Sequence, residues 1–155
     1  MKLTSERFSE GAAIPARHTC DGADLSPPLA WTAAPPATVT QALICDDPDA
    51  PGKTWVHWVL YNLPAHVTAL PEGVPKSETL ENLGGARPGT TDFERVGYGG
   101  PCPPPGKPHR YFFKLYALDA RLELPAGARK AEVERAMKGH ALAEAQLMGT
   151  YKRGG

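Results

Sequence analysis

Two short segments of this chain carry residue types that can bind an anion. The first, DPDAPGKTWVHW, spans Asp47 to Trp58, and the second, GGPCPPPGKPHRY, spans Gly99 to Tyr111. Imidazole and phenol groups can donate hydrogen bonds to phosphate-like oxygens, and so can the amides of a glycine-rich loop. The aspartates would repel an anion, so we expect them to accept hydrogen bonds from imidazole N–H groups or to receive a ligand's ammonium or hydroxyl group. Together the segments predict one small anion-binding pocket.

The alternation of side chains along an extended strand places both histidines beside aromatic residues. In TWVHWVLYNL, Trp55 and His57 share a face, and in HRYFFKLYAL, His109 and Tyr111 do the same. Both segments carry apolar residues on both faces, which predicts central strands that are covered on each side. Each histidine follows a proline- or glycine-rich loop, and a polar rim at the end of a hydrophobic sheet is a common ligand site.

Single residues of this set also have simpler interpretations. The aspartates of DPDAP can bond their own backbone in a turn, and for Asp49 this alternative stands beside direct ligand contact. The Ala50–Pro51 bond is a candidate cis peptide. Arg110 lies on the opposite face from His109, so we expect it to pair with a carboxylate beneath the site. Either histidine alone would be interpreted as structural, but their occurrence together with an acidic turn and a tyrosine favours a binding site.

Length and charge limit the classes of protein that this chain can represent. A chain of 155 residues is long enough for one sizeable core, which predicts a single domain over residues 1–155. Lys plus Arg and Asp plus Glu both number 17, so no general attraction to nucleic acid or to an anionic membrane is expected. The start, MKLTSERFSEG, lacks the apolar run of a secretory signal, and no apolar stretch is long enough to span a bilayer. We therefore expect a cytoplasmic protein without integral membrane association.

The cysteines predict reduced thiols. Cys20, Cys45 and Cys102 are an odd number without CxxC spacing, which argues against a disulfide framework and against a zinc knuckle. Cys45 lies in the apolar run QALIC and is expected to be a small buried residue. Cys102 lies in the GGPCPPPG loop beside the expected pocket, where a reactive thiol is the alternative.

Seventeen prolines and sixteen glycines interrupt the chain and favour a β-rich sandwich. The segments SPPLAW, AAPPAT and LPEGVPKSETLENLGGARPGT are expected to be loops. The expected strands are Leu3 to Ser5, Thr38 to Cys45, Trp55 to Asn62, Thr91 to Arg95 and Arg110 to Leu118.

The only convincing helical pattern lies near the C-terminus, in KAEVERAMKGHALAEAQLM. Apolar residues recur there at helical spacing, from Val133 through Met137, Ala141 and Ala145 to Met148. Gly139 could split the stretch into two short helices, and Gly149 is a candidate helix C-cap.

These motifs resemble those of the phosphatidylethanolamine-binding protein family, whose members include kinase-inhibitor proteins, and the prokaryotic branch is the nearer match. The resemblance rests on DPDAP followed by WVHW, GYGGPCPPPGKPHRYFFKLYALD, HTCDGADLSPPLAW, NLPAHVTALPEG and the closing GHALAEAQLMGTYKR. Because these segments extend over nearly the whole chain, the likeness concerns the complete fold.

The resemblance implies a mainly β fold, namely a β-sandwich with Greek-key connections and short peripheral helices, including a C-terminal helix. It also implies a small cavity for phosphate-like or carboxylate anions, including phospholipid headgroups. The family's ligand-binding positions correspond here to Asp47, Asp49, Trp55, His57, His109 and Tyr111, with backbone contributed by the loop of Gly100, Pro101 and Cys102. The exact donor within this loop stays open, because the run PCPPPGKP differs from that of other members.

Three functional classes follow from these residues and from the resemblance. The first is a non-enzymatic module for a small anion or a phosphorylated partner, which could modulate a kinase or protease as relatives are said to do. The second is a hydrolase in which the same aspartates and histidines hold a metal or act as acid and base, but no HExxH or GxSxG spacing occurs. The third, a carrier of whole lipids, lacks a basic amphipathic helix. We predict the first class, without a cofactor, and note that homodimers are common among prokaryotic relatives.

Overall fold

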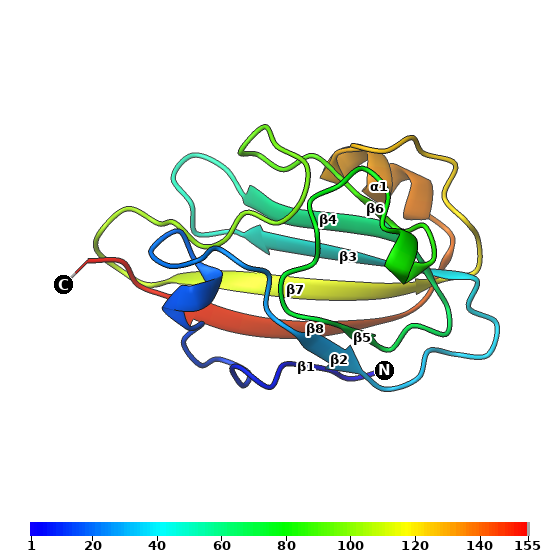
Figure 1. Cartoon of the computed structure of the whole chain (residues 1–155), viewed down its shortest axis with the longest axis horizontal. Coiled ribbons are helices and arrows are strands. Elements are labelled where there is room, and N and C mark those ends of the chain that lie inside the picture. The colour runs from blue at the N-terminus through cyan, green and yellow to red at the C-terminus, as the bar shows by residue number, and fades with distance from the viewer. Residues whose placement is uncertain (155) are drawn as a thin grey trace.

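Two antiparallel sheets form the framework of the molecule (Figure 1). The computed structural model describes residues 1–154. The larger sheet has the strand order β6 (Arg87–Pro88), β4 (Trp55–Pro64), β3 (Thr40–Asp47), β7 (His109–Leu118) and β8 (Ala141–Tyr151). The smaller sheet has the order β1 (Leu3–Thr4), β2 (Leu29–Trp31) and β5 (Ala69–Leu70). The helices are α1 (Lys130–Met137) and the 3-10 turns η1 (Ala16–His18) and η2 (Glu81–Leu83).

Both faces of the larger sheet are covered, as the apolar residues on both faces of its central strands predict. One cluster of buried side chains joins its inner face to the smaller sheet and includes Leu43, Trp58 and Phe113. A second cluster joins its other face to α1 and includes Ile44 and Val133. All eight residues of β3 are buried. The mainly β fold is therefore confirmed, while the Greek-key connections stay a prediction.

Most of the expected strands are present, with two kinds of error. The strands expected near Leu3, Thr40, Trp55 and Arg110 correspond to β1, β3, β4 and β7. The strand expected at Thr91 to Arg95 is wrong, because this segment is a tight turn closed by the Thr91 N–H bond to the Arg95 carbonyl. The short strands β2 and β6 lie in segments that were expected to be loops.

The expected C-terminal helix is half right. Helix α1 ends at Met137, and the chain turns at Gly139, which has a left-handed φ of 82°. The following residues form β8, which pairs with β7 from Leu118 to His109. The capping role expected of Gly149 is therefore wrong, because this residue lies within β8 opposite Tyr111.

Two cysteines form a disulfide, which corrects the expectation of reduced thiols. Cys20 and Cys102 are joined with their Cα atoms 5.4 Å apart, and 82 residues separate them in sequence. The fold brings the segment after η1 against the glycine- and proline-rich loop, so the two cysteines meet although no sequence spacing links them. Cys45 is a free, buried thiol, as expected. The cis bond expected at Ala50–Pro51 is wrong, since every peptide bond in the described chain is trans.

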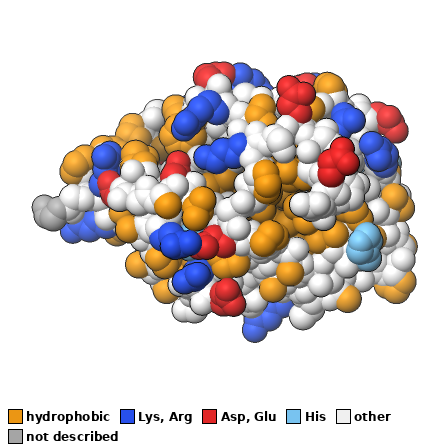
Figure 2. All heavy atoms as spheres, viewed as in Figure 1, with side chains coloured by type: hydrophobic (Ala, Val, Ile, Leu, Met, Phe, Trp, Pro, Cys, Tyr) orange, Lys and Arg blue, Asp and Glu red, His pale blue; other side chains and the backbone are white. Residues whose placement is uncertain are grey.

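Charges of both signs are mixed over the visible face of the molecule (Figure 2). This distribution agrees with the equal numbers of acidic and basic residues in the sequence. Within residues 1–154, no helix combines the length and the apolar character needed to cross a membrane.

Candidate functional site

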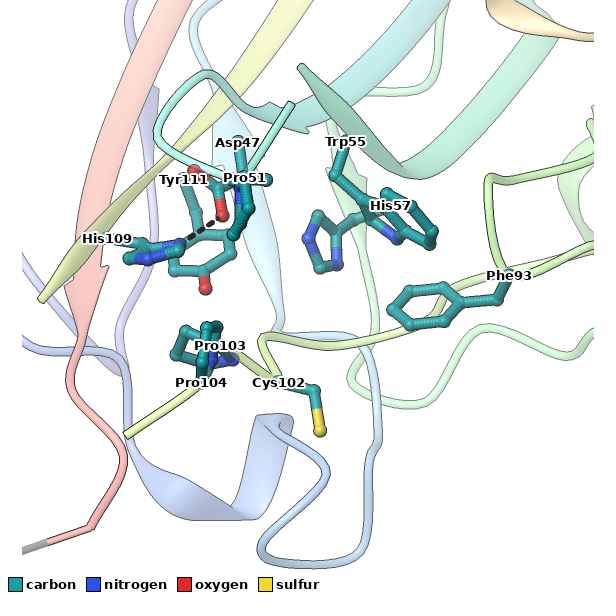
Figure 3. Close-up of a pocket in the computed structure, with 11 residues that line it drawn as sticks. Asp47, Pro51, Trp55, His57, Phe93, Cys102, Pro103, Pro104, His109 and Tyr111 are labelled. Carbon is teal, nitrogen blue, oxygen red and sulfur yellow. Dashed lines mark hydrogen bonds and ion pairs between the residues drawn. The ribbon is translucent and has the colours of Figure 1, made fainter. Parts of the chain in front are cut away.

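The two chemically suggestive segments meet at one end of the larger sheet (Figure 3). Asp47 ends β3, Trp55 begins β4 directly opposite it, and His109 begins β7. These strand ends and the loops beyond them enclose a cavity of about 160 Å³. The cavity is lined by Asp47, Ala50, Pro51, Trp55, His57, Phe93, Cys102, Pro103, Pro104, His109 and Tyr111.

Asp47 fixes the orientation of His109. The Nδ1 atom of His109 lies 2.7 Å from Oδ2 of Asp47, and the other carboxylate oxygen accepts the backbone N–H of Asp49 at 2.7 Å. Both side chains are largely buried. The carboxylate therefore directs the Nδ1 face of the imidazole into the protein and leaves the Nε2 face for other partners. This is the orienting role that the sequence predicts for an aspartate of the site.

His57 is held by backbone instead of by a carboxylate. Its Nδ1 lies 2.7 Å from the carbonyl oxygen of Gly99. A carbonyl can only accept, so Nδ1 carries the proton of the neutral ring. The ring is buried, and burial lowers the pKa of His57 below its usual value. The His57 ring is therefore neutral in the empty protein, and an anion bound beside it would favour its protonation.

Two buried donors of the cavity, the hydroxyl of Tyr111 and the indole N–H of Trp55, have no hydrogen-bond partner among the described residues. Both side chains belong to residues that line the cavity. Burial, with the nearby carboxylate of Asp47 second, raises the pKa of Tyr111, so its hydroxyl keeps its proton. Unpaired buried donors cost free energy in the empty protein. A ligand oxygen that reaches either atom would satisfy it.

Phe93 forms a wall of the cavity that the sequence pattern does not reveal. Its ring centroid lies 5.3 Å from that of His57 and 5.6 Å from that of Trp55, in edge-to-face arrangements. The residue sits in the turn where a strand was expected, so strand alternation could not place it. The one sequence feature that could have indicated Phe93 is an aromatic side chain within the polar segment DFER, because such a side chain is expected to pack against other residues.

The glycine-rich loop forms the roof of the cavity, but its first residues face the protein. The Gly100 N–H donates to Oδ1 of Asp24 at 2.9 Å, and the carbonyl of Pro101 accepts the N–H of Cys20 at 3.1 Å. Neither Gly100 nor Pro101 lines the cavity, whereas Cys102 does. The neighbouring residues Pro103 and Pro104 complete this side. Of the three loop residues predicted for the site, the structure brings only Cys102 to the cavity.

Asp49 lies outside the cavity lining. Its carboxylate accepts two hydrogen bonds from the Arg110 guanidinium, at 2.9 Å and 2.8 Å, and one from the Arg110 backbone N–H. The hydrogen bond from the Arg110 side chain is the main reason that the pKa of Asp49 is lowered. The pairing expected for Arg110 is present. The self-bonding turn expected of the DPDAP aspartates is made by Asp47, which accepts the Asp49 N–H, whereas the Asp49 carboxylate bonds Arg110.

Comparison with known protein families identifies the family of this chain. The model of the phosphatidylethanolamine-binding protein family matches residues 4–152 of the chain. The chain belongs to the phosphatidylethanolamine-binding protein family. This membership confirms the resemblance seen in the sequence motifs, and with it the family's general property of ligand binding.

Relatives in this family match over nearly the full length. A UPF0098 protein of Methanothermobacter thermautotrophicus is 51% identical over 99% of this chain and 100% of its own length, and one of Aquifex aeolicus is 47% identical over 99% and 89%. The crystal structure of a family homologue from Chlamydia trachomatis superposes with a TM-score of 0.89 at 39% identity, covering 99% of this chain and 97% of that one. Escherichia coli YbcL gives 0.91 at 34% identity, with 99% and 98% covered.

Proposed function

We propose that the protein binds a small anion, either phosphate itself or the phosphate group of a phosphorylated ligand such as phosphoethanolamine. The observation that carries the proposal is the unpartnered, buried hydroxyl of Tyr111, which faces a cavity shared with two histidines. A tyrosine hydroxyl and an indole N–H donate without titrating near neutral pH, while His57 and His109 can add positive charge. Because acidic and basic residues are equal in number, the net charge gives an anion no general attraction, and capture depends on these local groups.

The size of the cavity supports a headgroup or free ion over a complete lipid. Its volume of about 160 Å³ is smaller than the roughly 300 Å³ at which pockets for drug-sized ligands begin. An ethanolamine phosphate carries both an anion for the donors and an ammonium group for a carboxylate such as Asp47. Binding of this kind needs no catalysis, and it would let the protein modulate a kinase or protease in the cytoplasm through a phosphorylated partner.

One observation favours a second candidate, a hydrolase. The short Asp47–His109 hydrogen bond is the arrangement that supports a histidine as general base. No group of three or more metal-ligating side chains occurs within residues 1–154. Incubation with phosphoethanolamine and assay of released inorganic phosphate separates the candidates. We expect no release above that of a His109→Gln variant, and release that depends on His109 would favour the hydrolase.

The binding proposal is tested by calorimetric titration of inorganic phosphate and of phosphoethanolamine. His109→Gln should weaken phosphate affinity about tenfold, which corresponds to one charge-assisted hydrogen bond. His140 is a matched control, because its Nδ1 lies 2.8 Å from Oδ1 of Asp119 in a second histidine–aspartate pair. His140 precedes β8 at the end of the sheet away from His109. His140→Gln should keep the wild-type affinity, and equal losses in both variants would contradict the proposal.

A further inference from the structure

One disulfide cross-links the loop that covers the cavity to another segment of the chain. The roof segment is defined here as residues 102–108, of which Cys102, Pro103 and Pro104 line the cavity. Four of its seven residues are prolines, which have no N–H to donate. Within the described chain, no backbone hydrogen bond joins this segment to other residues. Its covalent cross-link to another part of the chain is the disulfide to Cys20, called the clasp below.

The clasp is reachable from solvent on one side. Cys20 is exposed, whereas Cys102 is partly buried. In Figure 3 the sulfur of Cys102 points away from His57 and His109. The Cys102 sulfur also lies 3.5 Å from Nη1 of Arg153, whose Nε is 3.2 Å from Oδ1 of Asp21. A guanidinium beside a sulfur stabilises the thiolate and makes it a better leaving group.

We propose that the Cys20–Cys102 clasp is a thiol–disulfide exchange site that takes a dithiol reductant and controls the affinity of the cavity for its anion. The inference rests on the proposed function, because it concerns the regulation of the same site. An exposed disulfide at a ligand-binding roof is accessible to the dithiol reductants of a reducing compartment such as the cytoplasm.

The exchange proceeds in two balanced steps. A thiolate of the reductant attacks the sulfur of Cys20, the more exposed residue of the pair, the disulfide bond breaks, and its electron pair leaves on the sulfur of Cys102 as a thiolate beside Arg153. The second thiol of the reductant, as its thiolate, then attacks the mixed disulfide and releases the thiolate of Cys20. The reductant is oxidised to its disulfide, and the protein gains two electrons and, on protonation of the sulfurs, two protons.

Reduction would weaken anion binding for two reasons. The roof segment loses its covalent attachment, so the closed cavity becomes one state among several, and apparent affinity falls with the closed fraction. A Cys102 thiolate would also add a negative charge behind the cavity lining, because Cys102 lines the cavity while its sulfur points away from it. Arg153, which contacts this sulfur, is itself paired with Asp21, so its positive charge is partly balanced. Both effects act against a bound anion.

The test compares phosphate affinity in the two redox states of the full chain. Thiol titration of the unfolded protein should find only Cys45 before treatment with dithiothreitol, and all three cysteines after it. Calorimetry should show phosphate bound about tenfold more weakly by the reduced protein, as for a roof closed about one tenth of the time. Oxidised glutathione should restore the original affinity. Circular dichroism before each titration confirms that the reduced chain stays folded.

Two variants and one ligand-free measurement complete the test. Cys20→Ser should bind phosphate like the reduced protein with or without dithiothreitol, whereas Cys45→Ala should respond like the wild type. Hydrogen exchange at the amides of Cys20 and Gly100, which bond across the joint between the two segments, should accelerate on reduction. Equal affinities in the two redox states would overturn the clasp and leave the proposed function intact. Absence of phosphate binding in both states would reject the proposed function and this inference with it.

The role of Arg153 is tested by the rate of reduction. Arg153→Gln should slow the reduction of the disulfide by dithiothreitol about threefold, because the leaving thiolate loses its neighbouring positive charge. Lys152→Gln removes the adjacent exposed charge and should leave the rate unchanged. With glutathione as a single thiol, peptide mapping should find the mixed disulfide on Cys20. An adduct on Cys102, or equal rates in both variants, would contradict the proposed direction of exchange.

Discussion

Asp47 and Asp49 are two residues apart, yet their carboxylates have different tasks. Asp47 is buried and binds His109 at the wall of the cavity. Asp49 is partly exposed and pairs with Arg110, half of whose side chain is exposed. Exposed ion pairs of this kind contribute at most about 1 kcal/mol. Asp47 therefore lines the candidate site, whereas Asp49 links the turn after β3 to the start of β7.

Strand alternation predicted the site residues that lie on strands. Trp55, His57, His109 and Tyr111 all face the cavity because residues two apart share a face of a strand. Phe93 could not be found in this way, since a turn has no comparable period. The hydrogen-bond partners of the histidines were harder to predict than the strand faces on which the histidines lie. The Gly99 carbonyl reaches His57 only because the loop folds back over the strand.

At Tyr111, removal of a single oxygen separates binding from stability. In Tyr111→Phe the lost hydroxyl has no protein partner, so the free energy of unfolding should stay within about 0.5 kcal/mol or rise. Phosphate affinity should fall about tenfold, because one hydrogen bond to the ligand is lost. Urea unfolding and calorimetry measure the two quantities. A large loss of stability with unchanged affinity would mean that the hydroxyl serves the fold.

At the scale of elements, the C-terminal segment shows why helical periodicity gave a wrong prediction. Residues four apart share a face of a helix and also a face of a regular strand, so the four-residue spacing of this segment does not distinguish the two. The structure resolves the ambiguity through β7, whose free edge β8 pairs over nearly its whole length. Tertiary pairing of this kind overrides local helix propensity. Helix α1 survives because Val133 and Met137 are buried against the larger sheet.

Substitution of Gly139 tests whether this residue lies in a helix or in a turn, because the free energy of unfolding should change in opposite directions in the two cases. In a continuous helix, Gly139→Ala would stabilise the protein by about 1 kcal/mol. In this structure Gly139 has a φ of 82°, and no atom lies within 4 Å of the place that an added Cβ would take, so only backbone strain matters. Alanine should therefore lower the free energy of unfolding by about 1 kcal/mol. Asparagine tolerates this conformation better and should lose less. Urea unfolding of both variants measures these changes in the free energy of unfolding. A higher value for Gly139→Ala would contradict the turn at this position.

At the scale of the whole molecule, the disulfide is the feature that the sequence could not provide. Counting cysteines and their spacing tests for local frameworks, but Cys20 and Cys102 meet only because two loops 82 residues apart pack together. In the unfolded state this cross-link would close a long loop, so its reduction should cost roughly 2–4 kcal/mol of stability. The sandwich itself was predictable, since its central strands carry apolar residues on both faces and the length of the chain allows one large core.

The whole molecule also contains buried histidines that make stability depend on pH. Burial lowers the pKa of His57 and of His18 below the unfolded value of 6.5. The unfolded chain therefore binds more protons than the folded chain as pH falls below about 6.5. The contribution of the two neutral histidines to the free energy of unfolding is therefore fully present above about pH 6.5. It is lost as the pH falls toward the lower pKa values of the folded state. The carboxylates with lowered pKa, such as Asp49 and Glu72, lose their contributions only at more acidic pH.

Phosphate should reduce this acid sensitivity. We expect the free energy of unfolding to be about 1–2 kcal/mol lower at pH 5.5 than at pH 7.5 without ligand. A bound anion favours the charged form of His57 and raises its pKa toward the unfolded value, so the share of the loss that comes from His57 should disappear at saturating phosphate. The share from His18, which does not line the cavity, should persist. Urea unfolding at both pH values, with phosphate or with matched sodium chloride, measures the difference. If phosphate stabilises the protein equally at both pH values, His57 does not take up a proton when the anion binds.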